Sequence, residues 1–463
     1  MKVLLCHTYY MQRGGEDDCY EEERDLLRAK GHQVVEYVRR NEELTRLNSL
    51  AAAAVTLWNR RAARDICNLI IDEQPAVVHC TNTFPLISPA ACHAAHRAGV
   101  PVVQALHNYR WLCAGAYFMR DGRPCEDCLT SRLPWPAIRH RCYRGSASAS
   151  AVVAGMQVLH GLRRTIDKID AFFTPTEFAK QRFVNGGFPP NRVHVKSNSV
   201  QPDPAEGRGE GGYLAFIGRL CIEKGITTLL DAWRRHASLP PLVIAGDGPL
   251  AADVVSAAAS DPRIKWHGQL PTAEIHRIVG AASALVMPSL WYETFGRTIV
   301  EAFATGTVVV ASRLGAMAEL VDENRTGWLF EPGNSDDLAA KVHRLHAAPP
   351  HEIAAMRRSA RQEYELRFTP ERNYARLIEI YDMAQREAEI RRERRAAART
   401  GTVEGGKHPI ALATKTSGSG VSFEPTQRRG EDRFFEEERD LSAAHDHHVV
   451  EYVRTNSELT GLG

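Results

Sequence analysis

The chain has 463 residues, which is enough for two or three domains. Its 44% hydrophobic and 25% charged content is that of a globular protein, and a net charge of +2 gives no reason to expect a nucleic-acid partner. No run approaches the roughly 20 apolar residues of a membrane span, and the opening MKVLLCHTYY is too short for a signal peptide. We therefore expect a cytoplasmic protein whose cysteines are reduced or bound to metal.

The first half of the chain alternates apolar strands with helical segments. A charged helix is predicted at 17–30, ending at Gly31. Strands are predicted at 3–6, 34–38, 76–79 and 102–106. Such alternation favours a parallel, doubly wound α/β sheet.

Two features of this half lie where strands end. Gly14 and Gly15 follow the first strand, and their lack of side chains would let the backbone approach a ligand closely. His107 follows the strand at 102–106, at the edge of the sheet where ligands bind in such folds.

Four cysteines come directly after His107 with the spacing C-x11-C-x2-C-x13-C: Cys113, Cys125, Cys128 and Cys142. This spacing suits tetrahedral zinc, and a metal would order a polar loop that buries little of itself. A structural zinc is expected here, with free thiols, a disulfide pair and an iron–sulfur cluster as alternatives. The other six cysteines are interpreted as packing residues.

A second alternating set of strands and helices follows a Pro- and Gly-rich stretch at 201–212. Its first strand leads into Gly218 and Arg219, and then into Lys224 at the entry of a helix. Arg219 and Lys224 are suited to neutralise a diphosphate, Arg as a planar fork and Lys as a point charge.

Two glutamates, Glu293 and Glu301, stand eight residues apart in an E-x7-E element. Glu293 lies in a turn after the apolar run 284–287, and Glu301 lies about one turn inside the helix that follows. A helix N-terminus offers free N–H groups and a positive dipole to an anion. A ligand with both phosphates and hydroxyls, such as a nucleotide sugar, fits this combination.

Four segments together resemble the donor-binding half of retaining glycosyltransferases of family 4, which have the GT-B fold. They are GRL…EKG (218–225), AGDGP (245–249), ETFGRTIVEAFATGTVVVAS (293–312) and GAMAELV (315–321). The resemblance covers about residues 1–385. It implies two doubly wound Rossmann-like domains that face across a cleft, with a C-terminal crossover helix.

The resemblance also implies a function. A hexosyl unit would pass from a UDP or GDP sugar to a saccharide or lipid-linked acceptor with retention of configuration, in cell-surface polysaccharide or glycolipid synthesis. No catalytic metal is expected, because cations and a helix N-terminus would assist departure of the diphosphate. The alternatives are a nucleotide-sugar epimerase on the same fold and an inactive nucleotide-binding scaffold.

Residue roles follow from the resemblance. Glu293 and His107 would contact the donor sugar, and Glu301 would bind the ribose hydroxyls. Arg219 and Lys224 would hold the diphosphate. The remaining donor-binding positions are backbone groups: Gly14, Gly15, Gly218, Phe295 and Gly296.

The expected domain organisation has six parts. They are an N-terminal acceptor-side domain at 1–200 with the cysteine loop at 113–142, a linker at 201–212, a nucleotide-sugar domain at 213–367, a crossover helix with a basic extension at 368–399, a disordered linker at 400–427, and a partial repeat of 13–47 at 428–463. The basic run 391–399 is interpreted as a solvated face, with peripheral contact at the inner face of the membrane as the alternative.

The C-terminal repeat matches the N-terminus closely. Residues 431–460 are identical to 16–45 at 20 of 30 positions, but the first strand is missing and Arg429 stands where Gly14 would be. We interpret the repeat as a truncated duplication, because a lone helix and strand cannot bury a core. The alternative is a mimic that competes for the place of the first helix and second strand.

Overall fold

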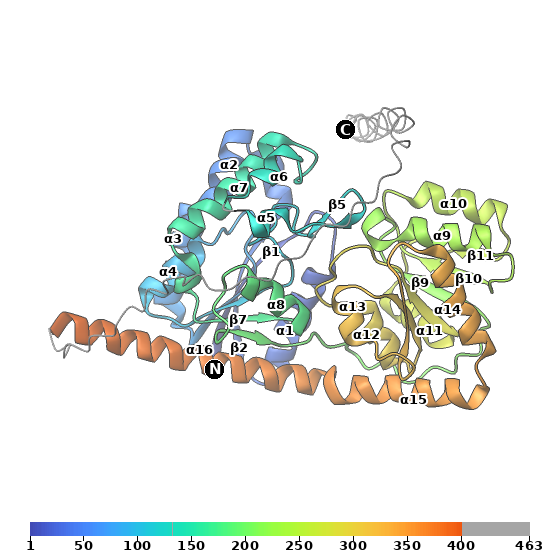
Figure 1. The fold of residues 1–463 in the computed structure, drawn as a ribbon. Helices are drawn as coiled ribbons and strands as arrows, with labels where there is room; N and C mark the ends of the chain where they lie inside the picture. Colours follow the sequence, from blue (N-terminus) through green and yellow to red (C-terminus); the bar gives the residue numbers. More distant parts are fainter. Residues whose placement is uncertain (132, 401–463) are drawn as a thin grey trace, which may run out of the picture. The chain divides into compact units, whose positions relative to one another are not determined.

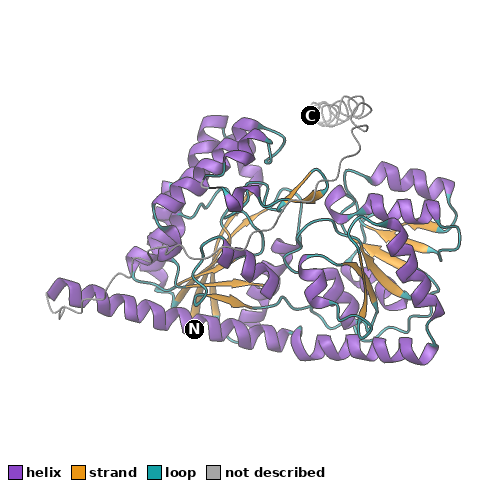
Figure 2. Cartoon of the chain, in the orientation of Figure 1, coloured by secondary structure: helices purple, strands orange, loops and turns teal. Residues whose placement is uncertain are grey.

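Two six-stranded sheets form the framework of the computed structural model, which describes residues 1–131 and 133–400 (Figures 1 and 2). The first sheet has the order β2-β1-β3-β4-β7-β8 and the second β11-β10-β9-β12-β13-β14. Every pairing in both sheets is parallel. The predicted α/β class with two parallel sheets is confirmed.

The strands of the first sheet are β1 Lys2–Tyr9, β2 Gln33–Arg40, β3 Val77–Asn82, β4 Val102–Ala105, β7 Ala171–Thr174 and β8 Val193–Val195. Those of the second are β9 Leu214–Ile217, β10 Leu242–Ala245, β11 Ile264–Trp266, β12 Ala284–Met287, β13 Val309–Ser312 and β14 Gly327–Phe330. A short antiparallel hairpin joins β5 Met119–Arg120 to β6 Arg123–Pro124.

The helices that surround the first sheet are α1 Gly15–Ala29, α2 Ser49–Leu57, α3 Arg60–Glu73, α4 Ala90–Ala98, α5 Asp127–Thr130, α6 Trp135–Arg139, α7 Ala147–Leu162 and α8 Glu177–Asn185. The later helices are α9 Ile226–Arg235, α10 Ala251–Ser260, α11 Thr272–Ala281, α12 Arg297–Ala304, α13 Gly315–Leu320, α14 Ser335–Ala347, α15 Pro350–Arg367 and α16 Pro370–Thr400. Three 3₁₀ turns are η1 Asn41–Arg46, η2 Thr165–Lys168 and η3 Ile222–Lys224.

Most strands have continuous apolar sequences, because both faces of a parallel sheet are covered by other elements. In β1, all residues from Val3 to Thr8 are buried. One face of the first sheet packs on α3 and α4, and the other packs on α1 and α16.

The last helix, α16, returns to the first sheet after the second sheet is complete (Figure 1). Leu377, Ile380 and Ala384 are fully buried against β1, β4 and β7. The hydroxyl of Tyr381 lies 2.8 Å from Nδ1 of His79 in β3. The predicted crossover helix with its basic extension is confirmed as the single helix α16, Pro370–Thr400.

The later part of the stretch at 201–212 is hydrogen-bonded to the second half of the chain. The backbone N–H groups of Gly207 and Gly209 donate to the carbonyls of Thr305 and Gly280 at 2.9 and 3.0 Å. A Cβ on Gly207 would stand 2.1 Å from the Gly280 oxygen. The glycines that indicated a linker thus permit close backbone packing.

The predicted repeat at 428–463 and the predicted linker at 400–427, apart from its first residue, lie outside the described residues. Within residues 1–131 and 133–400, no helix is both long and apolar enough to cross a membrane. The division into domains at 200, 213 and 367 stays a prediction.

Candidate active site

Glu293 lies in the loop between β12 and α12 with only 5% of its surface exposed. Its Oε1 accepts hydrogen bonds from Lys224 Nζ at 2.6 Å, Ser289 Oγ at 2.8 Å and Trp291 Nε1 at 2.9 Å. Burial alone lowers the pKa of Lys224, but attraction to Glu293 outweighs it and the pKa is raised. The Lys224 side chain remains 28% exposed, so its ammonium can also face a bound anion.

Gly225 is what allows Lys224 to reach this carboxylate. It begins α9 with a φ of +72°, and a Cβ there would stand 1.8 Å from the carbonyl oxygen of Pro288. Only glycine therefore lets the turn after β9 touch the loop after β12. No role of Gly225 was predicted from the sequence.

Gly218 and Arg219 directly follow β9. The turn is close to the one after β10, since a Cβ on Gly246 would stand 1.9 Å from the Gly218 oxygen. Arg219 is exposed and makes no ion pair within residues 1–131 and 133–400. Its guanidinium is therefore available to an anionic ligand.

The N-terminus of α12 is open. Gly296 takes a φ of +91° and begins the helix. In the described part of the chain, the N–H groups of Phe295 and Gly296 have no hydrogen-bond partner. The Phe295 side chain is buried in the second core, so this position offers its backbone to a ligand.

Glu301, 7% exposed, lies inside α12 and accepts from Arg297 Nε at 3.0 Å. The same guanidinium donates to Glu22 of α1 at 2.5 Å. Burial would lower the pKa of Arg297, but Glu22 and Glu301 raise it. Burial raises the pKa of Glu22 to about 7 although Arg297 opposes this.

His107 follows β4, and its buried Nε2 has no hydrogen-bond partner in the described residues. Burial lowers its pKa to about 4, so the imidazole is neutral at pH 7. Its carbonyl accepts from Thr294 Oγ1 at 2.8 Å, and the Thr294 carbonyl accepts from Thr176 Oγ1 at 2.8 Å. These bonds join the His107 loop to the residue next to Glu293.

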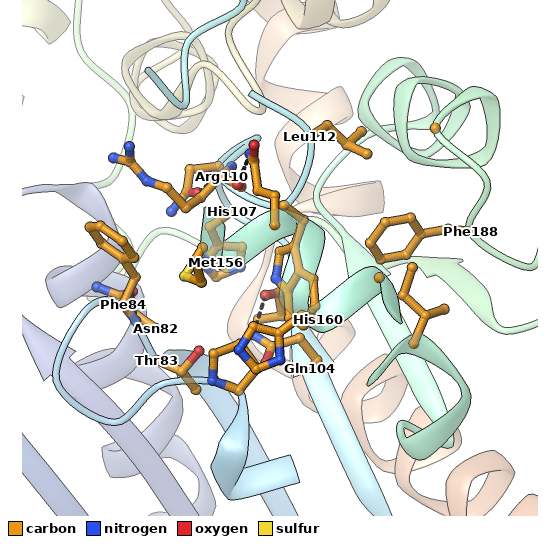
Figure 3. A pocket seen from close by; sticks show the side chains of 18 of the residues that line it. Asn82, Thr83, Phe84, Gln104, His107, Arg110, Leu112, Met156, His160 and Phe188 are labelled. Carbon is orange, nitrogen blue, oxygen red and sulfur yellow. Dashed lines mark hydrogen bonds between the residues drawn. The ribbon is translucent and has the colours of Figure 1, made fainter. Parts of the chain in front are cut away.

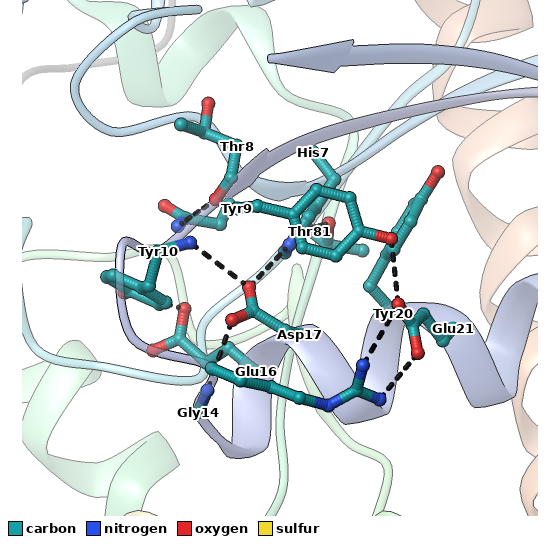
Figure 4. A network of polar contacts seen from close by, with 12 residues as sticks. His7, Thr8, Tyr9, Tyr10, Gly14, Glu16, Asp17, Tyr20, Glu21 and Thr81 are labelled. Atoms are coloured by element: carbon teal, nitrogen blue, oxygen red, sulfur yellow. Dashed lines mark hydrogen bonds and ion pairs between the residues drawn. The ribbon is translucent and has the colours of Figure 1, made fainter. Parts of the chain in front are cut away.

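A network of polar side chains from α1, β1 and β3 fixes the turn at Gly14 and Gly15 (Figure 4). Asp17 Oδ2 accepts from the Gly14 N–H at 3.1 Å, and Asp17 Oδ1 lies 2.9 Å from His7 Nε2. His7 Nδ1 lies 2.8 Å from Thr81 Oγ1. A Cβ on either glycine would meet nothing within 4 Å, so the space in front of the turn is open.

Glu16 is a further acidic group at this turn that the sequence analysis missed. Its carboxylate accepts from Asn108 Nδ2 at 2.7 Å and from the Tyr10 hydroxyl at 3.1 Å. Burial raises the pKa of Glu16, although both hydrogen bonds lower it. Because Asn108 neighbours His107, Glu16 belongs to the same edge of the first sheet.

A pocket of about 210 Å³ opens beside His107 (Figure 3). Part of its wall is apolar, with Phe84, Leu112, Met156 and Phe188 among the lining side chains. Three polar atoms of its lining are buried without a hydrogen-bond partner in the described residues: His107 Nε2, Gln104 Oε1 and Gln157 Oε1. Buried polar atoms are usually paired, so each of these three would be satisfied by an ordered water or by a ligand that reaches it.

The four clustered cysteines, Cys113, Cys125, Cys128 and Cys142, line one small cavity beneath α6. Residues 1–131 and 133–400 contain no group of three or more His, Cys, Asp or Glu side chains arranged to hold a metal ion. The donor set, four thiols around one space, is nevertheless that of structural zinc. Zinc binding stays a prediction.

Comparison with known proteins supports a family assignment. Residues 14–199 match the family described as "Glycosyl transferase 4-like domain", and residues 211–348 match "Glycosyl transferases group 1". An alpha-maltose-1-phosphate synthase of Mycolicibacterium smegmatis is 35% identical over 190 residues, which is 35% of this chain and 49% of that protein. A 2-deoxystreptamine glucosyltransferase of Streptomyces kanamyceticus is 34% identical over 190 residues, covering 36% and 48%. The chain spans about half the length of these relatives.

Solved structures share the fold. Anabaena HepE in complex with UDP has a TM-score of 0.57 at 17% identity, covering 82% of this chain and 99% of HepE. A Rickettsia africae glycosyltransferase has a TM-score of 0.60 at 16% identity, covering 83% and 98%. These neighbours confirm the predicted GT-B fold. The two family matches together cover most of the chain, which therefore belongs to the group 1 glycosyl transferases and carries a glycosyl transferase 4-like domain in its first half.

Proposed function

We propose that this protein transfers a hexosyl unit from a UDP or GDP sugar to a hydroxyl-bearing acceptor, with retention of configuration and without a catalytic metal. The observation that carries the proposal is the set of three donors around the buried Glu293 carboxylate, beside the open N-terminus of α12. The solved HepE complexes contain UDP and UDP-glucose, which supports a nucleotide-sugar donor here.

Departure of the diphosphate would be assisted by fixed positive charge. Arg219 is exposed and unpaired within the described residues, and the raised pKa of Lys224 keeps its ammonium charged. The N–H groups of Phe295 and Gly296 add the positive end of a helix dipole. Such preorganised charges stabilise the diphosphate as it leaves. A divalent cation has this role in other enzymes.

Glu293 and His107 would act on the donor sugar. The carboxylate of Glu293 is held in place and would stabilise positive charge that develops at the anomeric carbon. His107 is neutral, so its unpartnered Nε2 can bond a sugar hydroxyl without repelling that charge. Glu301 would accept hydrogen bonds from the ribose, with Arg297 fixing its orientation.

The pocket beside His107 is proposed as the acceptor site. Its apolar walls suit the C–H face of a sugar ring, and the amide oxygens of Gln104 and Gln157 suit hydroxyl donors. Arg110 is the charged residue that lines it, and its guanidinium lies over Phe84 at 4.5 Å. A neutral saccharide end, free or lipid-linked, is the proposed acceptor, in cell-surface polysaccharide or glycolipid synthesis at the cytoplasmic side.

The proposal is tested by incubating the full chain with UDP and GDP sugars, with and without saccharide acceptors, in EDTA. Acceptor-dependent release of nucleoside diphosphate with a new glycosidic bond is expected. Conversion of the donor sugar without any acceptor would identify an epimerase instead. Binding of nucleotide without turnover over a broad acceptor panel would favour a scaffold.

A further inference from the structure

Helix α6 and Leu133, two residues before it, present large apolar side chains to solvent. Leu133 is 55% exposed, Trp135 54% and Ile138 37%. The opposite side of this short helix is anchored, because Ala137 is fully buried in a cluster with Val153 of α7. Within the described residues the outer side chains are not covered by the fold that holds the helix in place.

The sequence around these side chains is rich in arginine. The stretch from Cys128 to Ile166 contains six arginines and no aspartate or glutamate, although the whole chain is nearly balanced at 58 basic and 56 acidic residues. Arg139, Arg141 and Arg144 are exposed within it. The guanidinium of Arg139 lies 6.0 Å from the Trp135 ring centroid.

A neighbouring segment has the same character. Residues 44–64 contain four arginines and no acidic residue. Leu50, at the start of α2, is 84% exposed. Helices α2 and α6 both pack against α7, and Leu57 of α2 packs on the cluster that holds Ala137 (Figure 1). Two acid-free segments with exposed apolar side chains therefore pack against the same helix, α7.

We propose that the α6 surface docks on a lipid bilayer that carries anionic headgroups. This surface consists of Leu133, Trp135, Ile138, Arg139, Arg141 and Arg144. Tryptophan and leucine enter the interfacial region of a bilayer, while arginines pair with anionic headgroups and keep their guanidinium groups in the polar layer. An apolar patch alone, or an acid-free stretch alone, would not indicate an anionic bilayer. The α6 surface combines both features, and the combination does indicate one.

The basic end of α16 is a weaker site for the same partner. Arg391 is paired with Asp170, and Arg395 is bonded to His96. Glutamates alternate with the arginines along this part of the helix, at 387, 389 and 393. Its large exposed apolar residue is Ile390, which is 41% exposed.

The test is sedimentation of the full chain with vesicles of phosphatidylcholine, with and without phosphatidylglycerol. Binding is expected to require phosphatidylglycerol and to weaken as salt is raised. Each arginine near an anionic surface contributes about fivefold to binding, so Arg139→Gln with Arg141→Gln and Arg144→Gln should weaken it at least about tenfold.

The apolar half is tested by Leu133→Ser with Trp135→Ser, which should also weaken binding about tenfold or more. A matched control, Ile71→Ser with Leu366→Ser, removes side chains that are 70% and 63% exposed elsewhere and should leave binding unchanged. UDP binding and the melting temperature of each variant, unchanged from the parent chain, establish that it is folded.

A milder variant, Trp135→Phe, keeps an aromatic ring and so serves if the serine variants do not fold. Brominated lipid in the vesicles should quench part of the tryptophan fluorescence of the parent chain and less of that of Trp135→Phe.

Four results would overturn the proposal. They are absence of vesicle binding by the parent chain, equal binding to neutral vesicles, loss of binding only on Arg392→Gln with Arg394→Gln, and a change of oligomeric state in the α6 variants without a change in vesicle binding. The third result would assign the contact to α16, and the fourth would assign the surface to a second copy of the chain.

Discussion

Replacing Lys224 by methionine is the sharpest perturbation of the proposed donor site. The substitution keeps the length of the side chain but removes the ammonium that contacts Glu293 at 2.6 Å. Glu293 would retain Ser289 and Trp291 as hydrogen-bond donors, but it would lack a countercharge while only 5% exposed.

The structure sets the expected magnitude. Removing one partner of a fully buried pair costs about 3–5 kcal/mol of unfolding free energy. Because the Lys224 side chain is 28% exposed, water near its position would partly screen the unpaired Glu293 carboxylate. We therefore expect Lys224→Met to lower the unfolding free energy by about 1–3 kcal/mol. Adding Glu293→Gln removes the unpaired charge and should restore most of this loss. Turnover should fall at least about 100-fold in the single and the double variant, because the charge that stabilises the diphosphate stays absent.

The assay combines chemical denaturation with initial rates on the donor that the panel identifies. Lys341→Met is the matched control, since Lys341 is 21% exposed and lies 3.7 Å from Glu323 at a distant surface. It should change stability by about 0–1 kcal/mol and leave turnover unchanged. A double variant with restored turnover, or a single variant with the turnover of the parent chain, would show that the Lys224 charge does not stabilise the leaving diphosphate.

Four further predictions address other parts of the molecule. Glu301→Ala should weaken UDP or GDP binding by about 1–3 kcal/mol in calorimetry, through lost hydroxyl contacts. Purified protein should contain about one zinc per chain by metal analysis, and Cys125→Ser with Cys128→Ser should release it. A chain ending at Arg399 should keep the activity and melting temperature of the full chain, because every described element of the two sheets precedes that point. The pKa of Glu22 is raised from 4.5 to about 7 in the folded protein. The resulting stabilisation is full below pH 4.5 and is lost as the pH rises through 7. Glu22→Gln should therefore reduce the change of unfolding free energy over this pH range by about 3 kcal/mol.

Much of the fold and some contacts of the candidate site could be predicted because their signals are local. Apolar runs such as those of β1 and β12 are visible in a few residues, since strands buried on both faces leave no polar alternation. Glu293, Glu301 and Lys224 stand in short motifs beside strand ends. The structure places Lys224 against Glu293 and joins the His107 loop to Thr294.

The rest could not be predicted because it depends on pairs far apart in the chain. Arg297 bridges Glu301 to Glu22, which is 275 residues away from it. The i,i+4 spacing of Arg297 and Glu301 was visible, but nothing in the sequence marked Glu22. Glu16 meets Asn108 across 92 residues, and the need for glycine at 225 appears only when two loops are placed together.

In the proposed reaction, a sugar leaves a nucleoside diphosphate and joins an acceptor with its configuration retained. The most direct measurement is nuclear magnetic resonance of the product formed by the full chain from a ¹³C-labelled α-linked UDP or GDP sugar and a saccharide acceptor. We predict an α-linked product that appears in step with free nucleoside diphosphate, at the same rate in EDTA. A β-linked product, or nucleoside diphosphate released without a new glycosidic bond, would contradict the account.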